Sequence, residues 1–311
     1  MIAEYDVIIA TYNGEKYISE QLDSILNQSV KPKNIILRDD CSIDNTFHIL
    51  QKYSKVYSNI KIIKDNLKNL GYVKNFEKLC ESVESELVFF SDQDDVWLDN
   101  KAETMLNAFE DYKNSAVFTN AYLVDSDLKN KGFLLPKTFD VIKSSNDILY
   151  RNFVTGCTLA VRKKALMSLL PFPDGIPHDY WIGANCALNK DIKYINTPLI
   201  KYRQHETNVI GIKNTSITAK INKLKYDSVL KRREFLIEKY KLVNHLLNRG
   251  TVTNISLHST RNTLNSALSY RFGFNYLKPL RKSIGFKDFI IHLYDKLIIR
   301  VANIMSSVGY D

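Results

Sequence analysis

The chain has 311 residues, of which 45% are hydrophobic and 25% are charged, the ordinary composition of a globular protein with a buried core. No run of about 18 uncharged apolar residues occurs, which argues against a membrane-spanning helix. The amino-terminal segment has neither a basic stretch nor a small-residue cleavage site, so we expect no signal peptide. Cys41, Cys80, Cys157 and Cys186 are scattered and predict reduced thiols of a cytosolic protein rather than a disulfide framework or a zinc site.

The net charge of +9 is divided unevenly along the chain. Residues 201–311 carry 20 Lys and Arg against 7 Asp and Glu, whereas residues 1–200 carry 23 against 27. This division predicts a slightly acidic catalytic part followed by a basic region that meets an anionic partner.

Short β-branched runs alternate with helical patterns over the first 125 residues. Apolar residues at helical spacing predict helices near 18–26, 47–53 and 76–83. Strand–helix–strand alternation predicts an α/β fold with a mostly parallel sheet, helices on both faces, and ligands beyond the carboxyl ends of the strands. The predicted strands are Val7–Ala10, Asn34–Arg38, Ile60–Lys64, Leu87–Phe90 and Ala116–Phe118.

The second half of the chain changes character. A helix from His178 to about Leu188 is predicted to precede a strand over Ile192–Arg203. Beyond residue 215 come long basic segments with helical patterns. We therefore expect a catalytic domain over 1–215 and a basic helical region over 216–311, with helices at 216–248, 254–272 and 286–306.

Three carboxylates, Asp92, Asp94 and Asp95, lie within four residues directly after the apolar run Leu87–Phe90. At a buried strand end these charges repel one another and lose hydration unless a cation neutralises them. Mg²⁺ or Mn²⁺ suits such oxygen ligands and leaves positions for phosphate oxygens. A solvated acidic turn is the alternative interpretation.

Polar residues also follow the first three predicted strands. Tyr12 comes after the first strand, where its ring can stack on a nucleobase or belong to a simple turn. Two adjacent acids, Asp39 and Asp40, follow the second strand, and a carboxylate there can accept the imide N–H of uracil or thymine. Ser42 is predicted to cap the next helix. Lys74, near the third strand, either meets a phosphate or is a surface lysine.

In their order and spacing, these motifs resemble glycosyltransferase family 2, whose members are inverting enzymes with a GT-A fold. The matching segments are Ile8–Gly14, Arg38–Asp44, Asn69–Gly71 and Ser91–Trp97, and the resemblance covers roughly 5–210. It implies a Rossmann-like mixed, mostly parallel sheet followed by a C-terminal helical region. It also implies a nucleotide site built from Ala10, Thr11, Tyr12, Asn13, Asp39, Asp40, Asn69, Gly71, Lys74, Asp92 and Gln93.

The same resemblance assigns the metal and the base. Asp92 and Asp94 match the metal-binding DxD element for Mn²⁺ or Mg²⁺, with Asp94 as the main ligand and His205, in a Tyr-Arg-Gln-His motif, as a further ligand. Asp179 stands where the family carries its general base, and His178 replaces the usual Glu. The implied acceptor-side residues are Gly156, Cys157, His178, Trp181 and Arg203. Without the resemblance, His178-Asp179 reads as a helix cap and His205 as a surface histidine.

The expected activity is transfer of a sugar, with inversion, from a nucleoside diphosphate to a hydroxyl of a saccharide acceptor. The motif variants most resemble bacterial rhamnosyltransferases, which suggests L-rhamnose from dTDP-rhamnose; a UDP-hexose or UDP-N-acetylhexosamine donor is the alternative. Basic helices can lie on an anionic membrane. That would suit an acceptor linked to a lipid diphosphate such as undecaprenyl diphosphate, made for a capsule or another surface polysaccharide at the inner face of the plasma membrane. Packing on the catalytic domain, or a homodimer, is the alternative.

Two functions of other kinds compete with this expectation. A nucleic-acid-binding protein could use the basic tail, but that tail has no zinc spacing or recognition motif, so we expect no nucleic-acid partner. A nucleotidyltransferase needs a Gly-rich phosphate loop after the first strand, where this chain has only Thr11–Gly14.

Overall fold

The computed structural model describes residues 4–65, 68–111, 113–141, 147–149, 151–205, 226–250, 257–258 and 260–262. The chain divides into two compact units, 1–211 and 212–311, and each is described by itself. The boundary predicted after residue 215 lies within 206–225, outside the described residues.

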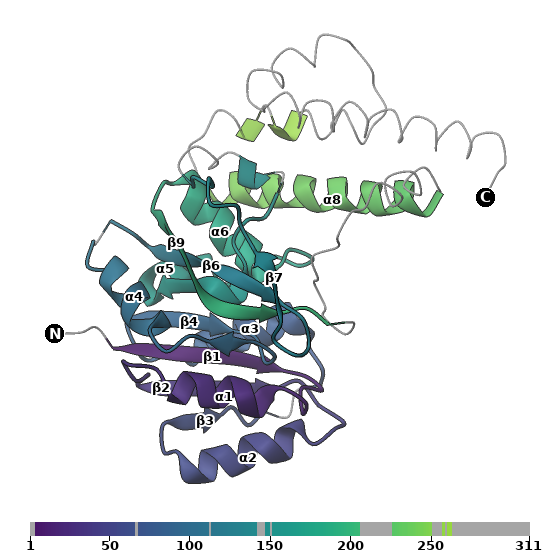
Figure 1. Ribbon diagram of the computed structural model, residues 1–311. Helices are drawn as coiled ribbons and strands as arrows, with labels where there is room; N and C mark the ends of the chain where they lie inside the picture. Colours follow the sequence, from purple (N-terminus) through teal and green to yellow (C-terminus); the bar gives the residue numbers. More distant parts are fainter. Residues whose placement is uncertain are drawn as a thin grey trace. The chain divides into compact units, whose positions relative to one another are not determined.

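The first unit is built on one sheet, which holds nine strands among the described residues (Figure 1). The strand order is β3-β2-β1-β4-β8-β6-β9-β5, and β7 pairs with β6 at the side of this path. The strands are β1 (Tyr5–Thr11), β2 (Asn34–Asp39), β3 (Ile60–Ile62), β4 (Leu87–Ser91), β5 (Val96–Trp97), β6 (Ala116–Val124), β7 (Asn130–Phe133), β8 (Leu159–Arg162) and β9 (Ile192–Arg203).

The sheet is mixed, as predicted. β1 runs parallel to both β2 and β4, β2 runs parallel to β3, and β6 runs parallel to β9. The short strand β8 joins the two parallel groups, because it is antiparallel to both β4 and β6. Since β1, β2 and β4 end at the same edge of the sheet, the polar residues that follow them are brought together.

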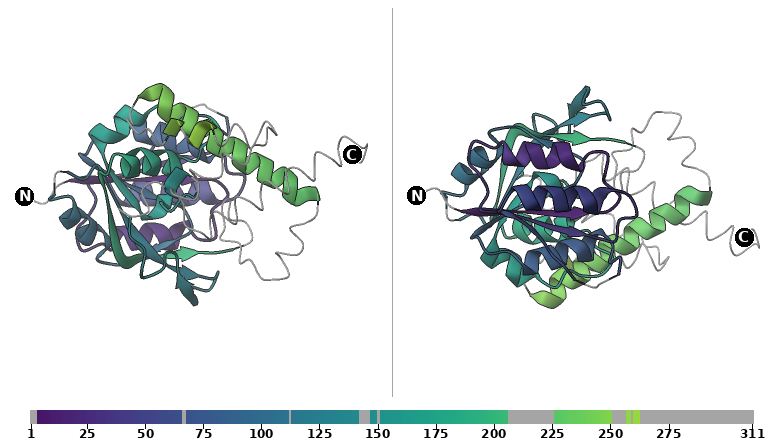
Figure 2. Two further views of the ribbon diagram at one scale, coloured as in Figure 1. Left: turned by 90° about the horizontal axis from the view of Figure 1, so that it is seen from above. Right: turned by 90° about the horizontal axis from the view of Figure 1, so that it is seen from below.

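Helices cover both faces of the sheet (Figure 2). Helices α1, α2 and α4 contribute to the core cluster on one face, whereas α3 contacts α5 and α6 on the other. Helix α1 buries one stripe of residues, as its helical spacing predicts, whereas α6 is buried nearly all round. The helices of this unit are α1 (Ile18–Leu26), α2 (Thr46–Val56), α3 (Tyr72–Glu81), α4 (Lys101–Ala108), α5 (Lys163–Leu169) and α6 (His178–Leu188), and two short 3₁₀ turns are η1 (Asp147–Leu149) and η2 (Gly156–Thr158).

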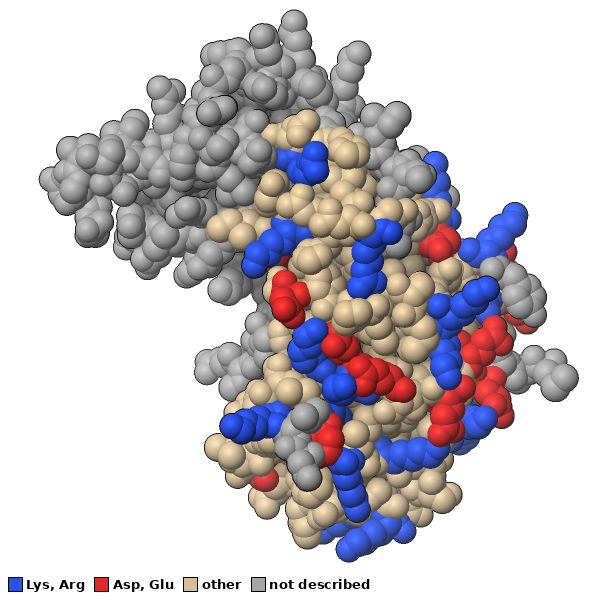
Figure 3. Space-filling view, turned by 180° about the vertical axis from the view of Figure 1, so that it is seen from behind, with Lys and Arg blue, Asp and Glu red and all other residues tan. Residues whose placement is uncertain are grey.

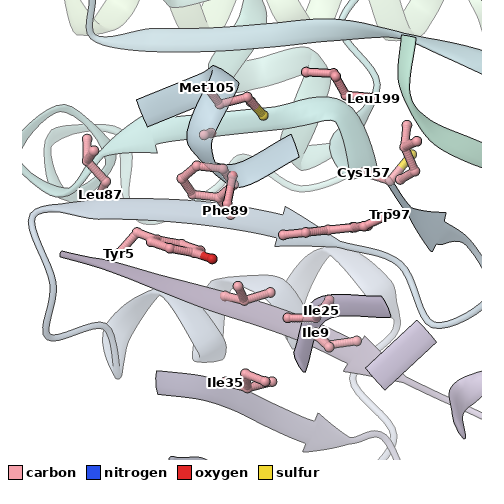
Figure 4. Packing of buried hydrophobic residues seen from close by; sticks show 14 of the residues in the cluster. Tyr5, Ile9, Ile25, Ile35, Leu87, Phe89, Trp97, Met105, Cys157 and Leu199 are labelled. Carbon is pink, nitrogen blue, oxygen red and sulfur yellow. The ribbon is translucent and has the colours of Figure 1, made fainter. Parts of the chain in front are cut away.

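Alternate residues of the central strands supply the two apolar layers, because successive side chains of a strand point to opposite faces. Phe89 of β4 packs with Tyr5 and Trp97 on the α1 side, with ring centroids 4.6 Å and 6.0 Å away (Figure 4). Its neighbour Phe90 faces α3 instead, 5.6 Å from the ring of Phe76. Both faces of β4 are therefore buried against apolar side chains. This packing fixes the position of the acidic residues at the end of the strand.

Most predicted elements lie where the pattern placed them, and β9 and α6 have the predicted bounds. The predicted cap is wrong: α2 begins at Thr46, three residues beyond the position that Ser42 would have to precede. The reason is that the Ser42 hydroxyl donates to Asp39 Oδ1 at 2.6 Å, within its own loop. None of the four cysteines, all of which are described, forms a disulfide; Cys41 is exposed and the other three are buried.

The second unit contains α8 (Tyr226–Arg249). Gly250, directly after this helix, has φ of 63°, a left-handed conformation typical of the residue that follows a helix. The helix predicted at 216–248 is thus found in part, whereas most of 254–272 and all of 286–306 lie outside the described residues. Among the described residues, no helix combines the length and apolar character needed to cross a bilayer. On the face seen in Figure 3, acidic and basic side chains of the described residues are interspersed.

Candidate active site

Tyr12 lies directly after β1, and its side chain is 48% exposed. Gln93 holds its main chain from both sides: the Tyr12 N–H donates to Gln93 Oε1 at 2.9 Å, and Gln93 Nε2 donates to the Tyr12 carbonyl at 3.0 Å. Gly14 leaves room for this amide, because a Cβ there would lie 2.3 Å from Gln93 Oε1. The ring of Tyr12 is therefore held by its backbone and presented to solvent, as stacking on a base requires.

The loops after β1 and β2 are bonded to each other. The Asn13 N–H donates to Ser42 Oγ, and the Ile43 N–H donates to Asn13 Oδ1, both at 2.9 Å. Thr11 Oγ1 donates to Asp39 Oδ1 at 3.0 Å. Asn13 adopts φ of 49°, a left-handed conformation that Asn tolerates better than most residues. The predicted residues Thr11, Asn13 and Asp39 thus form one continuous wall.

Asp40 is 2% exposed and lies at the centre of a buried hydrogen-bond network. Its carboxylate accepts from Arg38 and from the N–H groups of Leu70 and Gly71, each at 2.8 Å. The side chain of Asn69 donates to the Asp40 carbonyl at 2.9 Å. The loop after β3 is therefore tied to the end of β2, and Asp40 gives the nucleotide-side wall its shape.

Lys74, predicted to meet a phosphate, lies on α3 among acidic and carbonyl groups. Its Nζ is 3.1 Å from Glu77 Oε2, 3.5 Å from Asp174 Oδ1, and 3.2 Å from the Phe172 carbonyl that it donates to. These contacts tie α3 to the segment that precedes α6.

The acidic residues after β4 are crowded, as the sequence predicted. Ligand atoms of Asp92, Asp95 and Cys157 all lie within 4.8 Å of one another. The pKa of Asp92 is raised to about 7, first by burial and then by the negative charges of Asp94 and Asp179. The pKa of Asp95 is also raised, by burial and by Asp94 and Asp92. The carboxylates of Asp92 and Asp95 fit a hard divalent cation, which would relieve their repulsion, whereas the Cys157 thiol is a soft donor that such a cation does not prefer.

Asp94 and His205 meet across the site. His205 Nε2 lies 2.8 Å from Asp94 Oδ2, and the two side chains are 13% and 14% exposed respectively. His205 follows β9, whereas Asp94 follows β4, so the contact joins residues 111 positions apart. Two of the three residues that the resemblance assigned to the metal are therefore neighbours, and each has a partly exposed side chain.

Arg203, predicted on the acceptor side, is instead 2% exposed and engaged with protein oxygens. Its guanidinium donates to the Asp94 carbonyl at 2.7 Å and to the Ser126 carbonyl at 2.6 Å, and also pairs with Glu20. Its main-chain N–H donates to Asp95 Oδ1 at 2.9 Å. Arg203 therefore fixes the acidic turn rather than facing a solvent-filled site.

Asp179, the predicted base, is the second residue of α6. Its Oδ2 accepts from the Gly156 N–H at 3.0 Å, and its Oδ1 accepts from the Tyr180 N–H at 2.6 Å. Burial raises its pKa to about 6, although these hydrogen bonds oppose the shift. Gly156, which holds Asp179, directly precedes Cys157, whose ligand atom lies within 4.8 Å of those of Asp92 and Asp95, so Asp179 and the acidic turn are joined through η2.

His178 and Trp181, also predicted on the acceptor side, are enclosed in protein. His178 is 4% exposed and packs against Phe76 and Phe90, with ring centroids 4.1 Å and 5.4 Å away. Burial lowers its pKa to about 3, so the imidazole is neutral at ordinary pH. Trp181 is fully buried, and its indole N–H donates to the Leu169 carbonyl at 3.0 Å. Both side chains thus pack α6 against neighbouring parts of the protein.

Lys101 is a residue of this site that sequence reasoning missed. It is fully buried, and its Nζ donates to the Cys157 carbonyl at 2.6 Å. Its charge acts on both Asp92 and Asp95. No signal in the sequence separated it from other lysines, because the first residue of a helix is ordinarily solvated.

Comparison with known families assigns the first unit to one of them. The family model "Glycosyl transferase family 2" matches residues 6–170, which include β1 to β4 and the acidic turn. The chain belongs to glycosyl transferase family 2. It is accordingly a glycosyltransferase, as the motifs predicted, and the second unit lies beyond the matched residues.

Two curated relatives come from bacterial polysaccharide synthesis. The dTDP-rhamnosyl transferase RfbG of Shigella flexneri is 29% identical over 79% of this chain and 87% of its own length. The Escherichia coli enzyme WfgD, a UDP-Glc:α-D-GlcNAc-diphosphoundecaprenol β-1,3-glucosyltransferase, is 25% identical over 65% of this chain and 78% of its own length. The chain is thus similar to enzymes whose donors differ in both sugar and base.

Among solved structures, S. aureus TarS 1-349 in complex with UDP-GlcNAc is similar to this chain with a TM-score of 0.61. The likeness covers 98% of this chain and 92% of TarS at 19% identity, and it confirms the GT-A fold.

Proposed function

We propose that this glycosyltransferase acts by direct displacement, with Asp179 as the general base and a divalent cation, Mn²⁺ or Mg²⁺, held by Asp94, Asp92 and His205. The observation that carries the proposal is the geometry of η2: Gly156 donates its N–H to Asp179 Oδ2 at 3.0 Å, and the next residue, Cys157, has its ligand atom within 4.8 Å of those of Asp92 and Asp95. The bound cation would offset the negative charge that develops on the departing diphosphate.

The donor nucleotide is proposed to lie along the wall formed after β1, β2 and β3. Tyr12 stacks on the base, while the polar groups of Asn13 and Asp39 line its edge. The contact between Asp40 and Gly71 holds the loops after β2 and β3 together beneath the nucleotide. Ala10 lines the same wall. Lys74 is proposed to exchange its contact with Asp174, whose side chain is 93% exposed, for a phosphate of the donor.

Asp179 is proposed to take the proton from the acceptor hydroxyl as its oxygen attacks the anomeric carbon. The carboxylate keeps one orientation because two main-chain N–H groups hold its two oxygens. Gly156 and Cys157 form the turn beside it and would border the acceptor. Attack opposite to the leaving diphosphate inverts the configuration at the anomeric carbon.

For the donor we propose dTDP-L-rhamnose, which the similarity to RfbG supports. The runner-up is a UDP-hexose or UDP-N-acetylhexosamine, which the names of WfgD and TarS 1-349 support. The test is a thermal-shift screen of dTDP-rhamnose, UDP-glucose and UDP-N-acetylglucosamine with Mn²⁺ or Mg²⁺, because a ligand that binds only the folded state raises its stability. Stabilisation by a UDP sugar alone would replace rhamnose.

For the acceptor we propose a saccharide on a lipid diphosphate, as the name of WfgD indicates for that enzyme. The basic excess of residues 201–311 suits contact with an anionic membrane surface. Sedimentation with vesicles of anionic lipid at low salt tests this contact. If the protein stays in the supernatant, the membrane contact is wrong, and measurement of the molar mass then tests a homodimer.

A further inference from the structure

Lys101 is an ionisable residue that is completely enclosed in protein. It is the first residue of α4, and its side chain has no exposed surface. A buried ammonium is costly unless it is paired and hydrogen-bonded, so a fully buried lysine calls for partners of opposite charge. The proposed catalytic machinery does not include this residue.

Its partners are shared between the acidic turn and the turn η2. Nζ donates to the Cys157 carbonyl at 2.6 Å and lies 3.8 Å from the ring centroid of Trp97. Burial lowers the pKa of Lys101 to about 7, and the negative charges of Asp95 and Asp92 oppose that shift. Burial raises the pKa of Asp92, and Lys101 opposes that shift in turn. Asp95 Oδ2 is buried and meets no hydrogen-bond criterion among the described residues, although the Cys157 side chain lies close enough to lower the Asp95 pKa.

The turn η2 connects Lys101 to Asp179. Cys157 is its middle residue, and the preceding residue, Gly156, donates its N–H to Asp179 Oδ2 at 3.0 Å. The turn is rigid, because Thr158 donates to the Thr155 carbonyl from both its N–H at 2.9 Å and its hydroxyl at 2.7 Å. Two hydrogen bonds and one rigid turn therefore separate the Lys101 ammonium from the Asp179 carboxylate.

The contact between η2 and α6 leaves little room for an alternative arrangement. A Cβ at Gly156 would lie 3.0 Å from His178 Nε2 and 3.7 Å from the Asp179 Cβ. His178 is itself held between aromatic rings. A displacement of η2 would therefore also displace the start of α6, where Asp179 lies.

We infer that Lys101 is a positioning residue that fixes η2, and through it Asp179, in register with the acidic turn Asp92–Asp95. The inference rests on the proposed function, because it takes Asp179 as the base. Lys101 itself touches no reacting atom. Its effect is on the step that needs Asp179, and the binding of the donor nucleotide depends on it much less.

The first test compares Lys101→Met, which keeps the length of the side chain, with the control Lys78→Met, at a lysine whose side chain is 39% exposed. We expect kcat for sugar transfer to fall about 10- to 100-fold in Lys101→Met, the usual effect of losing a residue that orients a ligand or catalytic group. The affinity for nucleoside diphosphate with Mn²⁺ should stay within about threefold of the parent value, since the ground-state contacts remain. A kcat within about twofold of the parent would overturn the inference.

A double-mutant cycle separates positioning from a general loss of structure. In the Asp179→Asn background, Lys101→Met should lower the residual rate no further, because residues that act as a unit are not additive. A full additional loss would show that Lys101 acts elsewhere. If Lys101→Met does not fold, Lys101→Gln carries the same test, because it keeps an N–H donor without the charge.

A readout without turnover distinguishes this inference from the proposed function. Faster hydrogen exchange is expected in Lys101→Met at the peptide that contains Gly156 and Cys157, and unchanged exchange there would contradict the inference even in an inactive preparation. A parent enzyme that transfers no sugar from any donor would instead refute the proposed function.

Discussion

His205 Nε2 lies 2.8 Å from Asp94 Oδ2, a contact that joins the ends of β9 and β4. Replacement of His205 by Ala should weaken metal-dependent nucleotide binding by about 10- to 100-fold, whether the imidazole binds the cation or orients the carboxylate. His48→Ala is the control, since His48 is exposed on α2. Titration with nucleoside diphosphate and Mn²⁺ measures both, and equal affinities would remove His205 from the site.

Asp179→Asn keeps the size of the side chain and removes the base. Since general-base catalysis contributes about 10²- to 10⁴-fold, we expect kcat to fall within that range. The affinity for the donor nucleotide should change little, because Asp179 belongs to the acceptor side. A variant with near-normal turnover would show that another group takes the proton.

The activity should depend on the ionisation of Asp179. Burial raises its pKa to about 6, and a base must be ionised, so kcat/KM should be constant above that pH and fall below it. The fall should be about tenfold per pH unit for a single ionisation. A bound cation can only move the midpoint lower, because positive charge favours the carboxylate.

This profile is best recorded with saturating Mn²⁺, which keeps Asp92 ionised and so isolates Asp179. A rate that stays constant from about pH 7 down to about pH 4 would contradict the role of a carboxylate with a raised pKa.

Gly14→Ala should weaken donor binding and leave the rate of the sugar-transfer step largely unchanged. The new Cβ would lie 2.3 Å from Gln93 Oε1, so the amide must leave the Tyr12 main chain. We expect KM for the donor to rise several-fold while kcat is largely kept, because ground-state binding alone is affected.

Gln93→Ala should give a similar increase, because it removes the same anchor. The Gly14→Ala/Gln93→Ala double variant should then be no worse than Gln93→Ala alone. A larger defect in the double variant would mean that Gly14 acts by another route, and steady-state kinetics of the three variants decides between the two.

Much of the fold was predictable because the pattern and the packing agree. The central residues of β1, β2 and β4, which are Val7–Ala10, Ile35–Leu37 and Leu87–Phe90, are all apolar, as is typical of strands covered on both faces. Polar residues follow each of them, and parallel strands bring such ends together. The nearness of Tyr12, Asp39 and the acidic turn follows from that geometry alone.

The remaining features depend on contacts that carry no local signal. Ser42 resembles a helix cap in sequence, but its hydroxyl meets Asp39 in the loop that folds back. Lys101 resembles a solvated residue at a helix start, yet long-range packing against η2 encloses it. Arg203 and His178 were expected at the acceptor, and both are buried by residues far away in sequence.

The central claim is that the acidic turn grips a cation, which in turn holds the donor diphosphate. Calorimetric titration of dTDP and UDP into the parent enzyme and into Asp94→Asn, each with Mn²⁺ and with chelator, tests it most directly. We expect affinity in the parent that requires Mn²⁺, and loss of that requirement together with most of the affinity in Asp94→Asn. For either nucleotide, equal affinity in the four combinations of protein (parent or Asp94→Asn) and metal condition (Mn²⁺ or chelator) would contradict the account.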